Sequence, residues 1–264
     1  MNANAIGDAV LVARDGAIAT VMLNRPQKLN ALTKAMWASL GDTIARLGAD
    51  ASVRCIVIRG AGERAFSPGN DIGEFAHERS NGAQARAYGA VMHATARALF
   101  DCPVPLVAQI HGICVGGGLE IAALCDLRIC GASSRFGAPI KNLGLVMAYA
   151  EMAPLVQLVG PAVALEILLE GRIFDAEEAK AKGLVTRVVA DAGVAAEVAA
   201  TAERIAEGAP LVARWHKKFA RRLADPAPIS AVEADECFDC FDTEDFRTGY
   251  AAFLAKRKPD FTGR

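Results

Sequence analysis

Apolar positions in this chain follow two spacings, one typical of buried strands and one typical of amphipathic helices. The first apolar run, VLVARDGAIATVML (10–23), predicts two strands joined by a turn at Asp15-Gly16. A helix that is capped by Thr33 and runs to about residue 47 follows. Its apolar residues recur at helical spacing: Met36, Trp37, Leu40, Ile44 and Leu47.

The order of strand, loop and helix then repeats along the chain. The predicted strands cover 54–60, 105–110, 126–130 and 183–189, and the predicted helices cover about 83–100 and 150–170, the last broken at Gly160-Pro161. From about residue 191 the pattern is only helical. Strands alternating with helices, followed by a helical tail, predict an α/β fold with a core over 1–194 and a separate helical region over 195–264.

Charge and apolar run length narrow the functional classes. Lys and Arg together number 29 against 30 Asp and Glu, without a long block of either sign, so nucleic acid is not a predicted partner. The longest apolar runs are far shorter than the roughly 20 residues that cross a bilayer. The first residues, MNANAIGDAV, lack the basic and apolar stretches of a signal peptide. We therefore predict a soluble, cytoplasmic protein without a membrane partner.

Seven cysteines form an odd set, most of them inside apolar segments. This pattern favours small buried side chains in a reducing compartment over a disulfide framework. Cys237 and Cys240 form one CxxC, but no second pair and no nearby histidine accompany it. Helical spacing explains that pair more simply than a zinc site, and we predict no metal.

One glycine-rich segment matches the sequence motif of a dinucleotide-binding site. The strand at 54–60 leads into GAGERA (60–65), which matches G-x-G-x-x-A. In a dinucleotide site the third small residue opens a helix, whereas here Pro68 and Gly69 follow and prevent one. We interpret the segment as a surface loop and do not predict NAD.

The segment VGGGLE (115–120) is a stronger candidate. Gly116, Gly117 and Gly118 lie where a helix begins, so unpaired N–H groups and the positive end of the helix dipole suit an anion or a carbonyl oxygen that becomes one. Glu120 lies in the first helical turn and faces the same spot. Alternatively, the glycines only permit close helix–strand packing and Glu120 only favours a helix start. Burial would raise the pKa of Glu120 and the helix start would lower it, so the sequence leaves the direction open.

A second glycine-bearing turn precedes it in AFSPGNDI (65–72). Gly69, between Pro68 and Asn70, can adopt a backbone geometry that other residues avoid. Such a turn can present a bare N–H group to a ligand. By itself this turn is a weak indication of function.

These segments together resemble the crotonase superfamily, the enoyl-CoA hydratase/isomerase family, over nearly the whole chain. The motifs that carry the resemblance, in the family's order, are LNRPQKLNAL (23–32), AFSPGNDI (65–72), HGICVGGGLEIAALCDLRIC (111–130), SRFGAPIKNLGLV (134–146), EILLEGRIFDAEEAKAKGLVTRVV (166–189) and AAFLAKRKPDF (251–261). The resemblance implies a crotonase-like spiral of ββα units with a C-terminal helical trimerisation region. Several motifs in order are much more specific than any one alone.

The resemblance also implies roles for three residues. The backbone N–H groups of Asn70 and Gly117 would form the oxyanion hole for the thioester of an acyl-CoA. Glu120 matches the family's first catalytic glutamate. Because the thioester itself acidifies the carbon next to it, the resemblance implies no cofactor and no metal; coenzyme A is part of the substrate.

The chain departs from the family at the second catalytic carboxylate. Hydratases carry a glutamate directly after the proline of the FG-x-P stretch, where this chain has Ile140. Isomerases use that position or an acidic residue several positions further along the chain, where this chain has Ala148. Glu151 is the nearest acid that can substitute, although it equally fits as a first-turn carboxylate favoured by the helix dipole. His111 is a second candidate proton carrier and equally fits as a structural histidine.

The remaining expectations concern substrate and assembly. Contacts to the acyl-CoA are implied for Lys28, Ala31, Ala65, Ser67, Gly69, Asp71, Ile72, Gly116, Pro139, Ile140, Leu145, Phe253 and Lys256. Phe253 and Lys256 would act from the C-terminal helices, in some members from a neighbouring subunit, within a homotrimer or a dimer of trimers. The variable stretch 74–100 would line the acyl group.

The function that these expectations favour is hydration of a 2-enoyl-CoA with Glu120 as the acid or base. A second hypothesis is another enolate-stabilised reaction that one carboxylate can serve: isomerisation, decarboxylation or thioester hydrolysis. A third hypothesis is a non-catalytic member that binds acyl-CoA, because Ile140 replaces the second glutamate.

Overall fold

The computed structural model describes residues 9–264 and has the α/β architecture expected from the sequence. Its larger sheet has the strand order β1-β2-β3-β5-β7-β10, and its smaller sheet has the order β4-β6-β8-β9. The large sheet consists of β1 (Val10–Asp15), β2 (Ile18–Leu23), β3 (Cys55–Gly60), β5 (Leu106–Ile110), β7 (Leu127–Gly131) and β10 (Arg187–Val189). The small sheet consists of β4 (Ala65–Ser67), β6 (Ile113–Val115), β8 (Arg135–Gly137) and β9 (Phe174–Asp175).

Each of three successive segments of the chain adds one strand to the large sheet and one strand to the small sheet. Strands β3, β5 and β7 each continue into a three-residue strand, β4, β6 and β8, which pair in parallel and are each followed by a helix. Each turn is therefore a ββα unit, and the spiral fold is confirmed. The sequence pattern did not predict the three short strands, because three residues are too few to show an alternation of apolar and polar positions.

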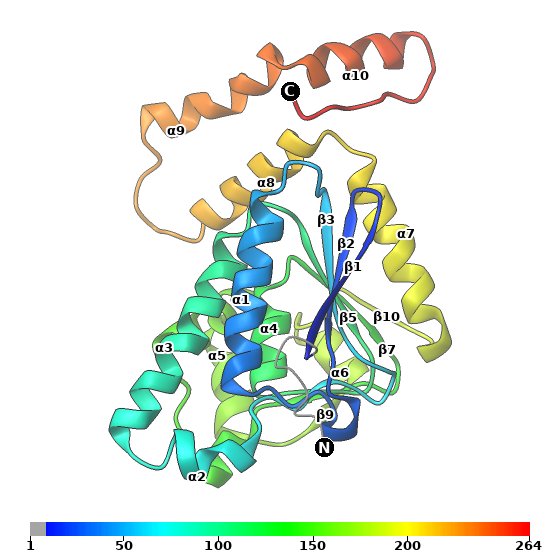
Figure 1. The fold of residues 1–264 in the computed structure, drawn as a ribbon. Helices are drawn as coiled ribbons and strands as arrows, with labels where there is room; N and C mark the ends of the chain where they lie inside the picture. Colours follow the sequence, from blue (N-terminus) through cyan, green and yellow to red (C-terminus); the bar gives the residue numbers. More distant parts are fainter. Residues whose placement is uncertain (1–8) are drawn as a thin grey trace.

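Helices cover both faces of the large sheet (Figure 1). The helices are α1 (Lys34–Ala49), α2 (Phe75–Glu78), α3 (Gly82–Asp101), α4 (Gly117–Leu124), α5 (Tyr149–Glu170), α6 (Ala176–Ala181), α7 (Val194–Ala206), α8 (Pro210–Arg222), α9 (Ala231–Asp235) and α10 (Glu244–Leu254). As predicted, Thr33 caps α1 by accepting a hydrogen bond from the Met36 amide, and Gly160 breaks α5 with φ of 76°. The loop at 60–65 leads into a strand and not into a helix, so its resemblance to a dinucleotide site is only local.

The central strands are buried on both faces. Alternate residues of β3 point in opposite directions: Ile56 and Ile58 join the main core under α1, α3 and α4, whereas Cys55 and Val57 join a smaller cluster with residues of α7. Continuous apolar strands of this kind are typical of parallel sheets that are covered on both sides.

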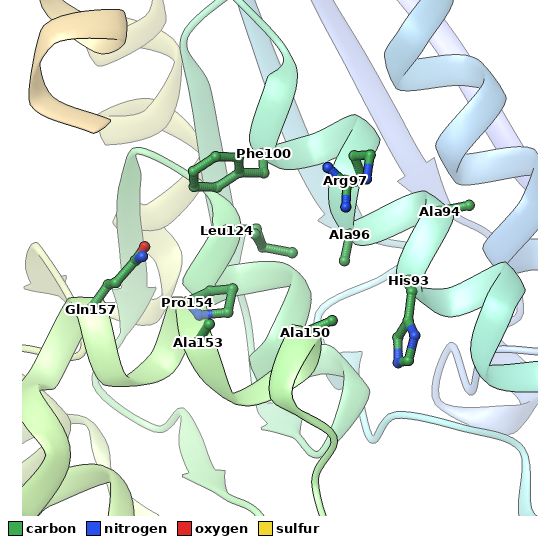
Figure 2. A pocket seen from close by; sticks show the side chains of 10 residues that line it. All are labelled: His93, Ala94, Ala96, Arg97, Phe100, Leu124, Ala150, Ala153, Pro154 and Gln157. Carbon is green, nitrogen blue, oxygen red and sulfur yellow. The ribbon is translucent and has the colours of Figure 1, made fainter. Parts of the chain in front are cut away.

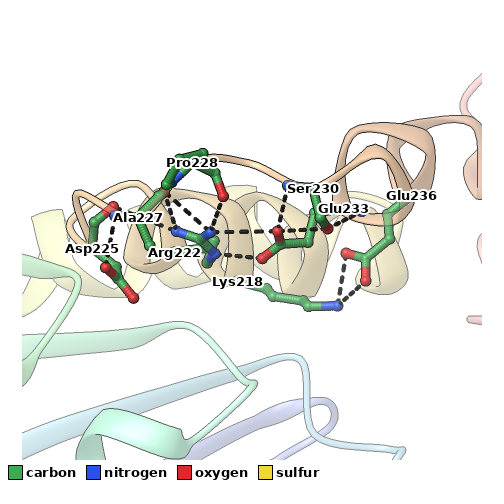
Figure 3. A network of polar contacts seen from close by, with 8 residues as sticks. All are labelled: Lys218, Arg222, Asp225, Ala227, Pro228, Ser230, Glu233 and Glu236. Atoms are coloured by element: carbon green, nitrogen blue, oxygen red, sulfur yellow. Dashed lines mark hydrogen bonds and ion pairs between the residues drawn. The ribbon is translucent and has the colours of Figure 1, made fainter.

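The C-terminal helical region is divided in its packing. Helix α7 packs on the sheet, and α8 is held to the core by Lys217, whose Nζ donates to the Val104 carbonyl at 2.7 Å and lies 2.7 Å from Asp126 Oδ2. Helices α9 and α10 stand apart from the sheet at one end of the molecule (Figure 1). Their links to α8 are polar: Lys218 contacts Glu236, and Arg222 contacts Glu233 (Figure 3).

Aromatic side chains on these last helices remain exposed in the single chain: Phe238, Phe241, Phe246, Tyr250 and Phe253. The role of this region in oligomerisation stays a prediction.

The structure also shows the state of the cysteines and one helix that is apolar enough to span a membrane. All seven cysteines are free thiols, five of them buried. Within residues 9–264 no cluster of three or more His, Cys, Asp or Glu side chains is arranged for a metal ion. By length and composition α5 is apolar enough to cross a bilayer, with a mean hydropathy of 1.8. However, Gly160 breaks this helix, and Leu155, Ala164 and Ile167 on it are buried in the core.

Candidate active site

Two glycine-bearing turns meet at the start of α4. A Cβ atom on Gly69, which has φ of +95°, would lie 2.6 Å from the Gly117 nitrogen, and one on Gly118 would lie 2.2 Å from the Ser67 carbonyl oxygen. Only residues without a Cβ atom permit this approach. The close-packing explanation of the glycines is thus correct, and it is also what brings the two turns together.

The amides of Asn70 and Gly117 are left without a protein acceptor among residues 9–264, whereas their neighbours are engaged. Leu32 donates to the Gly69 carbonyl at 2.8 Å, and Gly116 donates to the Gly137 carbonyl at 3.0 Å. Gly117 is the first residue of α4, so its N–H group has no partner within the helix and lies at the positive end of the helix dipole. The arrangement leaves two N–H groups, one from each turn, free to bind an oxygen.

Trp37 on α1 supports both turns. Its Nε1 donates to Asn70 Oδ1 at 2.7 Å, and its ring lies so close to Gly117 that a Cβ atom there would be 2.9 Å from Cζ2. The amide nitrogen of the Asn70 side chain lies 3.7 Å from Met92 Sδ. The sequence pattern identified Trp37 only as a core residue, because its contact with Asn70 depends on how α1 packs.

Arg25 and Asn30 fix the outer side of the first turn. Arg25 pairs with Asp71 at 3.0 Å and donates to the Ala31 carbonyl at 2.8 Å. Burial raises the pKa of Asp71, but hydrogen bonds from Arg25 and the Gly73 amide outweigh it and hold the pKa below its usual value. Asn30 Nδ2 donates to the Ala65 carbonyl at 2.8 Å. Sequence reasoning missed both Arg25 and Asn30, for which local spacing gives no signal.

These contacts reassign two predicted substrate-binding residues. Ser67 is fully buried; its hydroxyl donates to the Asn30 carbonyl at 2.9 Å and accepts from the Gly69 amide at 3.1 Å. Ala65 is also buried. Their side chains shape the turn and are covered by protein, so the predicted contact of these two residues with the substrate stays a prediction that only their backbone atoms can meet.

Glu120 lies in the first turn of α4, half-buried, next to the two free amides. Among the described residues its carboxyl group accepts no hydrogen bond. Burial raises its pKa to about 8, and the negative charge of Glu151 raises it further than Arg79 lowers it. Burial and the charge of Glu151 thus both favour the protonated form of Glu120.

Glu151 is the second carboxyl group of the site. Its side chain is 12% exposed, its Oε2 accepts from the Ala148 amide at 3.0 Å, and its Oε1 lies 3.2 Å from His93 Nε2. The structure confirms that Glu151 caps the start of α5, and its charge acts on Glu120; its substitution for the missing second glutamate stays a prediction. Ile140 packs against the main core.

His111 lies elsewhere. It is 7% exposed, its Nε2 is 3.4 Å from Gln109 Nε2, and burial lowers its pKa. The charged groups that act on it are Glu63, Asp191 and Arg59, and Glu120 is not among them. The structure therefore does not bring His111 to the carboxyl pair.

A cavity of about 410 Å³ opens between α3 and α5 (Figure 2). It is lined mainly by apolar side chains, with Leu124 from α4 at its base and His93, Arg97 and Gln157 as its polar members. His93 lines this cavity and also contacts Glu151, whereas neither carboxyl group and neither free amide is among the lining residues. Part of the stretch expected to line the acyl group, residues 93–100, forms one wall.

The other predicted binding residues are dispersed. Lys28 is exposed beside the first turn, Ala31 is buried, and Ile72 is 51% exposed. Pro139 and Leu145 are half-buried in the segment before α5.

Phe253 lies at the end of α10 and Lys256 just beyond it, away from α4 (Figure 1), and Phe253 is 81% exposed. Within one chain, these two residues do not join the site. Their predicted contact with the acyl-CoA therefore holds only if a second copy supplies them.

Comparison with known proteins agrees with this geometry. Residues 13–264 match the profile of the enoyl-CoA hydratase/isomerase family. The crotonyl-CoA hydratase of Syntrophomonas wolfei is 31% identical over 257 residues, covering 97% of this chain and 98% of that protein. The short-chain-enoyl-CoA hydratase of Clostridium acetobutylicum is 32% identical over 251 residues, covering 94% and 95%.

Solved structures are similar as well. An enoyl-CoA hydratase/carnithine racemase from Magnetospirillum magneticum is 53% identical and matches with a TM-score of 0.96, covering 97% of this chain and 96% of that one. A putative enoyl-CoA hydratase/isomerase family protein from Hyphomonas neptunium is 33% identical with a TM-score of 0.92, covering 97% and 98%. The chain belongs to the enoyl-CoA hydratase/isomerase family of the crotonase superfamily.

Proposed function

We propose that this protein adds water to a 2-enoyl-CoA. The observation that carries the proposal is the pair of free amides, of Asn70 and Gly117, beside two interacting carboxyl groups, Glu120 and Glu151. The two amides would bind the thioester oxygen and stabilise the negative charge that develops on it. Loss of one such donor typically costs about 2.7–4 kcal/mol of transition-state stabilisation.

The raised pKa of Glu120 suggests which carboxyl group gives a proton and which accepts one. Glu151, held by the Ala148 amide and by His93, would accept a proton from water as the water oxygen bonds to C3, the second carbon from the thioester carbonyl. The electron pair of the double bond moves toward the thioester oxygen. Glu120, whose raised pKa keeps it protonated, would then give its proton to C2, the carbon next to the carbonyl. Proton exchange between the two carboxyl groups restores the resting state.

The relatives support this reaction in part. Two of them, from Syntrophomonas wolfei and Clostridium acetobutylicum, are named as enoyl-CoA hydratases and cover nearly the whole chain. We further propose the same substrate class, an acyl-CoA thioester, with Lys28 near its phosphates and Phe253 and Lys256 supplied by a second copy in a homotrimer or dimer of trimers. The cytoplasm is the expected location, and no cofactor is expected.

Hydration of crotonyl-CoA, followed by the loss of absorbance of the conjugated thioester, tests the proposal. We expect turnover in the wild type and a strong reduction in both E120Q and E151Q. Turnover should also decline as the pH rises through about 8, where Glu120 loses its proton. A protein that binds crotonyl-CoA without converting it would contradict the proposal and would favour the non-catalytic alternative.

One observation favours a second reaction, proton transfer at C2 without water. Ile140 and Ala148 are apolar at the two positions where other members carry their second acid, and the relative from Magnetospirillum magneticum is described as an enoyl-CoA hydratase/carnithine racemase. Exchange of the C2 hydrogen of a saturated acyl-CoA in D₂O, measured by mass spectrometry, distinguishes this reaction. Exchange without hydration of crotonyl-CoA would replace the first proposal by the second.

A further inference from the structure

Glu151 lies at a position in the sequence different from that of the family's second glutamate, so the contacts that orient its carboxylate must also differ. It lies in the first turn of α5, and one of its carboxylate oxygens is already engaged, because Oε2 accepts from the Ala148 amide at 3.0 Å. A carboxylate held at one oxygen can still rotate its other oxygen between several directions. The only side chain among the described residues within hydrogen-bond distance of that other oxygen, Oε1, is His93.

His93 is well placed to fix this oxygen. It projects from the middle of α3, and its Nε2 lies 3.2 Å from Glu151 Oε1. Its ring folds back over the preceding turn of α3, near Gly89, in the direction that helical side chains prefer. Glu151 is only 12% exposed, so water competes poorly for its free oxygen. The contact joins helices α3 and α5, and His93 also lines the 410 Å³ cavity between them.

We propose that His93 is a positioning residue for Glu151: its Nε2–H group donates to Oε1 and holds the carboxylate in the orientation that accepts a proton from water. This inference rests on the proposed function, in which Glu151 is the base. A shift of about 1 Å in a reacting group can cost about 100-fold in rate, so a single hydrogen bond that fixes a side chain has a measurable effect on kcat.

The same geometry admits a competing role, which the experiment must separate. His93 also lines the cavity, where it would contact an acyl chain. A lining residue affects KM and the preference for chain length, and other lining residues would share that effect. Gln157 lines the same cavity from α5 and has no hydrogen bond to Glu151. Q157A is therefore the matched control.

The test compares wild type, H93A, H93Q, E151Q, the double variant H93A/E151Q, and Q157A with crotonyl-CoA and a six-carbon enoyl-CoA. We expect H93A to lower kcat about 10–100-fold with KM within about twofold. H93Q should restore most of the rate, because the glutamine amide can donate from a position near that of Nε2. The double variant should be no slower than E151Q, since His93 acts only through Glu151. Q157A, which changes a lining residue without a hydrogen bond to Glu151, should change KM or the preference between the two substrates and so reports the effect of the lining alone.

Several results would overturn the inference. These are an unchanged kcat in H93A, no recovery in H93Q, a double variant that multiplies the two losses, or an equal effect of Q157A. If the wild type does not hydrate crotonyl-CoA, the proposed function fails first. The same variants are then compared by exchange of the C2 hydrogen in D₂O, where independent effects of H93A and E151Q would reject the positioning role separately.

Discussion

Two ionisable side chains of this protein are removed from water in opposite ways. Lys217 on α8 is 7% exposed at its side chain and has two partners, the Val104 carbonyl and Asp126, each at 2.7 Å. Glu120 on α4 accepts no hydrogen bond from residues 9–264, and burial raises its pKa to about 8. Partners offset the free-energy cost of burying a charge, whereas a buried carboxyl group without them bears that cost in full.

The difference indicates what each side chain is for. Lys217 attaches the C-terminal helices to the core, and its needs are met within the protein. Around Glu120 the unmet groups are of complementary kinds: two amides without acceptors and a carboxyl group without a donor. Unsatisfied polar groups gathered at one place are typical of a site that a ligand completes.

The largest expected effect comes from removing the acid. E120Q keeps the size of the side chain but cannot give up a proton in the same way, so we expect kcat to fall about 100- to 10,000-fold with crotonyl-CoA. Unchanged activity in a folded E120Q protein would assign the proton transfer to another group. Circular dichroism provides the check on folding.

A slightly smaller effect is expected from closing the space between the two turns. In G69A the new Cβ atom would lie 2.6 Å from the Gly117 nitrogen, so the amides must move apart. We expect kcat to decrease about 100- to 1000-fold, as for the loss of an oxyanion-hole donor. G62A is the control: Gly62 also has a positive φ, of 71°, but its Cβ atom would meet nothing within 4 Å. Equal losses in both variants would mean that general destabilisation is the cause.

For Lys217, whose charge has partners, we expect substitution to change the free energy of unfolding and not kcat. K217M leaves the Val104 carbonyl without its donor and Asp126 with only Arg221 as a cation, at 3.3 Å, and we expect the free energy of unfolding to drop by about 1–3 kcal/mol. Denaturant titration measures this, and the folded fraction should keep the wild-type kcat. The neighbouring Lys218, 58% exposed at its side chain and paired with Glu236, supplies the control. K218M should cost less than about 1 kcal/mol, and an equal cost would contradict the importance of burial.

The smallest expected effect is a gain in stability from E120Q that depends on pH. In the folded chain Glu120 has a pKa of about 8, above its ordinary value of 4.5, so the folded state binds the proton more tightly than the unfolded state. The wild type therefore loses stability relative to E120Q as pH rises from about 4.5 through 8. We expect the Tm of E120Q to exceed that of the wild type at pH 9 by at least several degrees and the two values to converge near pH 5. A constant difference across this range would show that Glu120 is not held protonated.

Several site features could be read from local sequence. The alternation of strand-like and helix-like spacings predicted the α/β fold, the Thr33 cap and the break at Gly160, each of which depends on neighbours along the chain. The glycines at 69 and 116–118 marked both turns, because only glycine tolerates their backbone geometry and close contacts. Glu120 could be identified from the same segment, because it lies in the first turn of the helix that these glycines begin.

The sequence by itself determined which elements form and where two turns need glycine, because periodicity and backbone sterics act over a few residues. Tertiary structure decided the rest. It placed Trp37 behind both turns, joined His93 to Glu151 across 58 residues of chain, and left His111 away from the site. The direction of the Glu120 pKa shift was decided there too, because burial and the charge of Glu151 depend on how α4 and α5 pack, and no spacing along the chain records that.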